Sequence, residues 1–211
     1  MKNLTDLFRI VELTRAQIQY GYVLNNLKPG EASSLAEHHY LVTFIAWQLA
    51  RYAKSQGGNI DTERVMEYAL IHDLGELLGG DISRPYVDLN RKARTYAKAF
   101  EAENQKFLGK FFGDDKKHYL KLSKEMMQPN NDEAQIFKIA DYMECAHFLR
   151  YMGYYNKNDE RIVATSIPKM INKIKDKLAK KALKEFLVLW LKEIKKNKTT
   201  VDVFQQTRKK L

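Results

Sequence analysis

Residues 62–81 read TERVMEYALIHDLGELLGGD. Their apolar side chains recur at intervals of three and four, the spacing of one face of an α-helix. Asp61 or Thr62 provides a suitable N-cap, and a pair of glycines ends the pattern. The stretch therefore predicts a helix that continues to Leu78.

Three polar side chains, His72, Asp73 and Glu76, interrupt the apolar pattern within this helix. Adjacent helical residues point about 100° apart, so the side chains of His72 and Asp73 can converge on one ion between them. Glu76 lies one turn further along, beside the same spot. Because an ionised carboxylate is costly to bury alone, Asp73 needs hydrogen bonds, a cationic partner or a metal.

The rest of the chain repeats the helical period and contains no alternating pattern typical of strands, so the predicted fold class is all-α. Further helices are expected over about 5–18, 34–55, 88–112, 115–127 and 131–148, and Ser166 with Pro168 is expected to open C-terminal helices. We expect one core domain over residues 1–168 and a basic helical extension, residues 169–211, packed on the same domain.

The net charge of +10 is concentrated at the C-terminal end. Residues 169–211 contain fourteen Lys or Arg and four acidic residues, whereas residues 1–168 contain twenty-two of each. The lysines mostly flank an amphipathic helical pattern, which favours a solvated helix face over contact with an anionic partner. Nucleic acid is therefore not an expected partner, and the basic segment is expected to lie apart from the polar cluster.

Cys145 is the only cysteine, so no intramolecular disulfide can form and a reducing cytoplasm is the expected location. It lies in an apolar helical pattern that favours core packing over a reactive thiol. The longest strongly apolar run, residues 186–191, is about one third of the roughly 20 residues that a membrane span needs. We expect a protein without a membrane segment.

Two further polar residues, His38 and Asp141, also interrupt apolar helical faces, and they complete a recognisable order. Glu37-His38, then His72-Asp73, then Asp141 resemble the H...HD...D signature of the HD-domain superfamily. The run from His72-Asp73 through Glu76 to Gly80-Asp81 is more specific and is similar to the bacterial 5′-deoxynucleotidase branch. The resemblance covers roughly residues 5–155 and implies an HD-domain helical bundle.

The resemblance implies one divalent metal ion, Mn, Co, Zn or Fe, held by His38, His72, Asp73 and Asp141; two imidazoles and two carboxylates suit such metals. It implies hydrolysis of nucleoside or deoxynucleoside 5′-monophosphates to nucleoside and phosphate. The residue matching the catalytic glutamate, Glu76, would orient or deprotonate the attacking water. Asp81 would complete the catalytic site and is favoured as a ligand of the sugar hydroxyl. Homodimers are implied as well.

The chain departs from this branch in its first helix, where an arginine followed by an aromatic residue is expected. Arg15 is the candidate phosphate ligand, but Ala16 follows it, so Tyr20 or Tyr22 is the candidate aromatic partner. His118 is the only histidine between the His72-Asp73 pair and Asp141, whereas members of the superfamily that bind two metals generally have two histidines there. A site for two metals would therefore lack ligands.

Two alternatives stay open at this point. A nucleotide triphosphohydrolase or pyrophosphohydrolase would use the same metal ligands, although no glycine-rich phosphate loop is present. A non-enzymatic helical module could instead bind nucleic acid or protein through the basic segment. His39 and His147 are interpreted as structural.

Overall fold

The structure, a computed structural model, describes residues 2–80, 82 and 84–196. Over these residues all regular secondary structure is helical, apart from one isolated antiparallel bridge between Ile18 and Ser34. The all-α prediction is confirmed. None of the described helices is both long and apolar enough to cross a bilayer.

The α-helices are α1 (Lys2–Val11), α2 (Tyr20–Val23), α3 (Leu35–Ser55), α4 (Thr62–Ile71), α5 (Arg84–Leu89), α6 (Arg91–Leu108), α7 (Lys116–Met127), α8 (Asp132–Tyr151), α9 (Lys157–Lys173) and α10 (Lys177–Ile194). Short 3₁₀ turns are η1 (Glu12–Arg15), η2 (Pro29–Glu31), η3 (Leu74–Leu78), η4 (Gly109–Phe111) and η5 (Gly113–Asp115).

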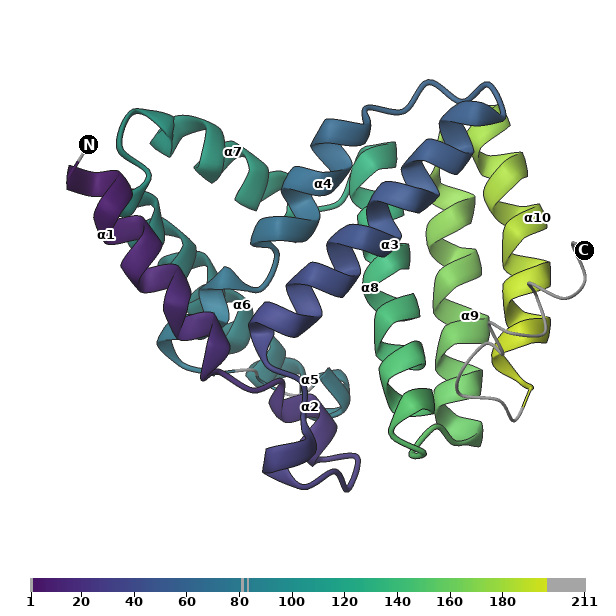
Figure 1. The fold of residues 1–211 in the computed structure, drawn as a ribbon, viewed down its shortest axis with the longest axis horizontal. Coiled ribbons are helices and arrows are strands. Elements are labelled where there is room, and N and C mark those ends of the chain that lie inside the picture. The colour runs from purple at the N-terminus through teal and green to yellow at the C-terminus, as the bar shows by residue number, and fades with distance from the viewer. Residues whose placement is uncertain (1, 81, 83, 197–211) are drawn as a thin grey trace, which may run out of the picture.

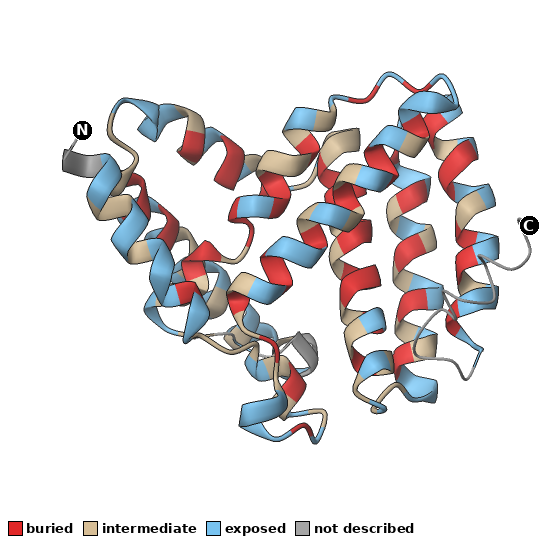
Figure 2. Ribbon diagram, in the orientation of Figure 1, coloured by how far each residue is buried: buried red, intermediate tan, exposed pale blue. Residues whose placement is uncertain are grey.

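Helices α3 and α8 form the centre of the molecule, with α4 packed against both of them (Figure 1). Helix α9 lies along α8, and α10 contacts α3 and α9. Buried residues lie on the faces at which these helices meet (Figure 2), and Tyr68, Phe137 and Ile136 are among the fully buried side chains. The apolar faces of these five helices thus close one core.

Side-chain caps fix where the helices that carry polar residues begin. Ser34 Oγ accepts from the Glu37 amide at 3.3 Å, and the Glu37 carboxylate accepts from the Ser34 amide at 2.8 Å, so the predicted capping box opens α3. His38 is consequently fixed in the first turn. The long helix predicted over 88–112 is instead divided, because Asn90 caps α6 by accepting from the Ala93 amide at 3.0 Å.

The helix predicted to continue to Leu78 ends at Ile71, which corrects the sequence interpretation. Asp73 leaves the helical region at φ −106° and ψ 13°, and the chain continues as η3. Tertiary contacts stabilise this break: Asn104 Nδ2 on α6 donates to the Gly75 carbonyl at 2.8 Å. A helical pattern in the sequence cannot reveal such a partner, because Asn104 lies far along the chain.

Helix α9 begins earlier than predicted. Asn156 accepts from the Asp159 amide and opens the helix, whereas Pro168 lies inside it. The predicted helix start at Ser166 and Pro168 is therefore wrong, and the boundary proposed at residue 168 falls within one continuous helix. Residues 197–211 of the predicted extension lie outside the described part of the chain.

Aromatic residues and methionines from Tyr142 to Tyr155, in the second half of α8 and just after it, mostly pack inside the molecule. Tyr142 and Met143 are buried in the main core. Phe148, Met152, Tyr154 and Tyr155 pack against a second cluster formed by Tyr22, Leu27 and Leu149. Tyr151 is the exception, with 67% of its surface exposed.

Candidate metal centre

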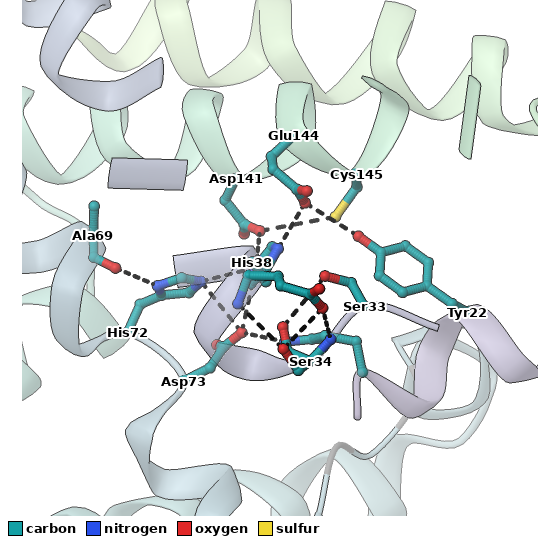
Figure 3. A network of polar contacts seen from close by, with 12 residues as sticks. Tyr22, Ser33, Ser34, His38, Ala69, His72, Asp73, Asp141, Glu144 and Cys145 are labelled. Carbon is teal, nitrogen blue, oxygen red and sulfur yellow. Dashed lines mark hydrogen bonds and ion pairs between the residues drawn. The ribbon is translucent and has the colours of Figure 1, made fainter. Parts of the chain in front are cut away.

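Four side chains from three parts of the chain converge in the interior (Figure 3). His38 comes from α3, His72 and Asp73 from the junction of α4 with η3, and Asp141 from α8. His38 Nε2 lies 3.1 Å from His72 Nε2, 3.6 Å from Asp73 Oδ2 and 3.5 Å from Asp141 Oδ1. The structure thus brings together the whole set of metal ligands predicted from the sequence.

The outer ring nitrogens of both histidines are occupied by hydrogen bonds. His72 Nδ1 donates to the Ala69 carbonyl at 2.8 Å, and His38 Nδ1 lies 2.6 Å from Glu144 Oε2. When both rings are neutral and carry their proton on Nδ1, each Nε2 has a lone pair that faces the other. Two lone pairs at 3.1 Å do not attract, so this arrangement suits a cation between them.

The donor atoms have the spacing and chemistry that a divalent ion requires. Donors about 2.1 Å from one transition-metal ion lie roughly 3 to 3.5 Å from each other, close to the separations observed here. His38, His72 and Asp73 form a group able to hold an ion, and Asp141 lies at its edge. Two imidazoles with carboxylates suit Mn, Fe, Co or Zn, so the residues fit the metal implied by the sequence.

Electrostatics keep the carboxylates of this cluster ionised. Burial alone would raise the pKa of Asp73, but His72 and His38 outweigh it, and the pKa lies well below its usual value. Burial would lower the pKa of His38, but Asp141 and Glu144 outweigh it and hold that pKa well above its usual value. The hydrogen bond from protonated His38 in turn lowers the pKa of Asp141 against the effect of burial. Both side chains therefore carry the negative charge that a metal ligand needs.

Two residues of the site were missed by the sequence interpretation. Glu144, which is only 1% exposed, holds His38 and also accepts from Tyr22 Oη at 3.2 Å. Its position three residues after Asp141, on the same side of α8, was the available signal. Gln19 Nε2 donates to Asp73 Oδ2 at 3.0 Å from a segment that shares no local pattern with the site.

The segment that carries Gln19 is fixed by backbone pairing beside the start of α3. Gln19 N donates to the Ser33 carbonyl at 2.9 Å, and Leu35 N donates to the Gln17 carbonyl at 2.8 Å. Tyr22, one candidate aromatic partner of the sugar, is instead buried against Glu144, whereas Tyr20 is 47% exposed.

The other predicted site residues, Glu76, Arg15 and Asp81, are not among the four side chains that converge. Glu76 lies in η3, where its amide donates to the Asp73 carbonyl at 2.9 Å and one of its carboxylate oxygens is shielded from solvent. Arg15 is not brought to the cluster: its side chain is 74% exposed and pairs with Glu12 at 2.6 Å. Asp81 lies outside the described residues.

The remaining polar residues around the cluster have structural surroundings. The Cys145 thiol lies 4.0 Å from Asp141 Oδ1, and burial together with the nearby carboxylates raises its pKa well above the usual value, so it stays protonated. Burial lowers the pKa of His39 to about 3. His147 accepts from Trp190 Nε1 at 3.0 Å, which supports its structural interpretation.

A cavity of about 580 Å³ opens beside His72 and Asp73. Its walls come mainly from α6, α8 and α9, and they include Lys169 and Lys173 of the basic C-terminal segment. The expectation that this segment lies apart from the site is therefore wrong for its first residues. The volume is within the range of small-molecule sites, so the cluster is accessible to a ligand of nucleotide size.

Comparison with known proteins gives relatives of one kind. A family model described as HD domain matches residues 20–186. A 5′-deoxynucleotidase from Vibrio vulnificus is 35% identical over 123 residues, 54% of this chain and 61% of that protein. One from Vibrio cholerae is 28% identical over 119 residues, with the same coverage. The chain thus spans less than two thirds of the length of these relatives.

Solved structures show a similar arrangement of helices. A protein from Pyrococcus horikoshii superposes with a TM-score of 0.65 at 21% identity, covering 92% of this chain and 99% of that one. A conserved hypothetical protein from Pyrococcus furiosus gives 0.61 at 24% identity, covering 88% and 98%. At these identities the likeness concerns the fold.

Proposed function

Because the chain belongs to the HD-domain family, we propose that it is a metal-dependent phosphohydrolase that converts nucleoside or deoxynucleoside 5′-monophosphates to nucleoside and phosphate. The observation that carries the proposal is the convergence of His38, His72, Asp73 and Asp141 beside a cavity of nucleotide size. The similarity to 5′-deoxynucleotidases supports the choice of substrate.

In this proposal the four converging side chains hold one divalent ion, which when bound polarises a phosphate oxygen and lowers the pKa of water. Glu76 lies one turn after Asp73, which places its carboxylate next to the metal ligands, and it takes a proton from the attacking water. Asp81 is proposed to hold the sugar hydroxyl. Arg15 is proposed as a phosphate ligand from the sequence resemblance alone. Gln19 and Glu144 keep Asp73 and His38 oriented.

Metal removal tests the proposal directly. We expect chelator-treated protein to release no phosphate from deoxynucleoside monophosphates, and added manganese, cobalt, zinc or iron(II) to restore release. The product should be orthophosphate; pyrophosphate or tripolyphosphate from nucleoside triphosphates would indicate the alternative hydrolase. Comparing the four metals identifies the preferred ion. Hydrolysis that continues unchanged after complete metal removal would contradict the proposal.

Replacing Glu144 by glutamine should weaken metal binding without removing a ligand. The carboxylate fixes the orientation of the His38 ring through Nδ1, and loss of such a partner typically reduces metal affinity about 10- to 100-fold. Metal titration followed by calorimetry measures the effect. Glu133→Gln, at the start of the same helix, is the matched control: the Glu133 carboxylate accepts from the Asp61 amide, so the variant should bind metal as the wild type does. If both variants bind metal with equal affinity, Glu144 does not contribute to metal binding.

We also propose a cytoplasmic homodimer. The single cysteine supports a reducing compartment. Leu41 on α3, 42% exposed, and the exposed Tyr151 of α8 line one apolar groove, and Phe44, 51% exposed, lines a second groove that shares Ile45 and His147 with it. These exposed apolar side chains support a contact between copies there. The molar mass in solution, measured by sedimentation, distinguishes a dimer from a monomer.

A further inference from the structure

The cavity beside the metal cluster has more positive charge than one phosphate group needs. Five basic side chains line it: Arg94 and Lys98 from α6, Lys138 from α8, and Lys169 and Lys173 from α9. The acidic lining residues are two, Asp73 and Glu101. Since Asp73 belongs to the metal cluster, Glu101 is the only carboxylate in the lining, among the described residues, left to offset the four lysines.

Helical spacing explains why the cations gather in one place. Arg94 and Lys98 are four residues apart on α6, as are Lys169 and Lys173 on α9, so each pair occupies one helix face. Lys138 lies one turn before Asp141 on α8, and its charge lowers the pKa of Asp141 and opposes the burial that raises the pKa of Glu101. The three helices therefore direct cations towards the same space.

The four lysines of the cavity do not form salt bridges with carboxylates of the described residues. Within the described part of the chain, Lys98, Lys138, Lys169 and Lys173 take part in no ion pair. Lys98, Lys169 and Lys173 are exposed, so water screens their mutual repulsion, and Lys138 lies over the ring of Phe137. Their combined positive potential along one cavity favours the entry of an anion. A structural role as internal ion-pair partners does not account for them.

We propose that the cavity binds a nucleotide with two phosphate groups. The scissile 5′-phosphate lies at the metal cluster, and the second phosphate is bound by Lys169 and Lys173 of α9. This inference rests on the proposed function for the scissile group. In the reaction a water oxygen bonds to phosphorus, the bond from phosphorus to its leaving oxygen breaks, and the water proton passes to that oxygen. With a 3′,5′-bisphosphate the products are orthophosphate and a nucleoside 3′-monophosphate that keeps the second phosphate. With a 5′-diphosphate the products are the nucleoside and pyrophosphate, because the second phosphate leaves joined to the first.

Binding and turnover of three deoxyadenosine nucleotides test this subsite. The 5′-monophosphate has one phosphate, the 3′,5′-bisphosphate has its second group on the sugar, and the 5′-diphosphate has it in a chain. We expect at least one of the two bisphosphorylated nucleotides to have a kcat/KM about tenfold or more above that of the monophosphate, the effect of one charge-assisted hydrogen bond. The preferred one shows where the second group is attached.

The double variant Lys169→Gln/Lys173→Gln should lose most of that preference, measured as the ratio of kcat/KM for the bisphosphorylated nucleotide to kcat/KM for the monophosphate, because the second phosphate has lost its two cationic partners. Lys177→Gln/Lys181→Gln is the matched control: it removes two exposed charges at the same spacing from α10 and should keep the preference. Equal loss in both double variants would indicate long-range charge alone and would overturn the subsite.

Direct binding separates this inference from the proposed function. Chelator-treated protein, in which turnover has stopped, should bind the preferred bisphosphorylated nucleotide at least about tenfold more tightly than the monophosphate. If hydrolysis is absent with every metal but this difference persists and depends on Lys169 and Lys173, the function fails and the subsite holds. If the monophosphate is hydrolysed but all three nucleotides bind and react equally, the subsite is wrong.

Discussion

Replacing Asp73 by alanine is expected to reduce phosphate release by at least about a thousandfold, since metal chemistry supplies several kcal/mol of transition-state stabilisation and 1.36 kcal/mol is a factor of ten. Asp73 lies 3.2 Å from His72 Nε2 and 3.6 Å from His38 Nε2, so its loss removes charge from the centre of the cluster. The measurement is orthophosphate release at saturating manganese, together with metal stoichiometry.

Two further variants make the result interpretable. Asp73→Asn keeps the shape of the side chain and should show the same loss if charge is what the ion requires. Asp61→Ala removes the carboxylate that caps α4 by accepting from the Arg64 amide, and it should reduce stability by about 1 kcal/mol while leaving metal binding unchanged. Full activity in a folded Asp73→Ala protein would exclude Asp73 from the mechanism.

Glu76→Gln should reduce kcat by about 10²- to 10⁴-fold, the usual contribution of a general base. Because Glu76 is not among the converging ligands, the variant should bind metal with the same stoichiometry, and KM should change little. A pH profile adds an independent measurement: the fall in rate on the acidic side, caused by protonation of the base, should disappear.

The matched control for Glu76 is Glu63→Gln, which neutralises an exposed carboxylate on α4. It should leave kcat and the pH profile as in the wild type. Loss of metal together with activity in Glu76→Gln would instead make Glu76 part of the metal site, and an unchanged kcat would assign the proton transfer to another group.

The polar cluster illustrates how much can be predicted from sequence when a pattern is local. His72 and Asp73 are neighbours within one apolar helical pattern, so their spacing alone indicated a shared ion. His38 follows a capping box that fixes the first turn of α3, but only the ordered signature selected it as a ligand. Asp141 needed the ordered signature in addition. The all-helical fold followed from the apolar period along each segment.

Tertiary structure decided what no local pattern contains. Gln19 reaches Asp73 because backbone pairing places residues 17–19 beside residues 33–35, and α4 stops at Ile71 because an asparagine on α6 stabilises the turn after it. Arg15 was a reasonable choice by sequence, yet it pairs with Glu12 at the surface.

The lysines of α9 show most clearly that a local sequence pattern does not predict which distant residues meet. In the sequence they are part of a basic segment that resembles a solvated face, and only the packing of α9 along α8 places Lys169 and Lys173 in the wall of the cavity. Sequence determined the helices and the four converging side chains, because helical period and ligand chemistry are properties of neighbouring residues. Tertiary structure alone decided which distant charges surround them, because helix packing sets contacts between residues far apart in the chain.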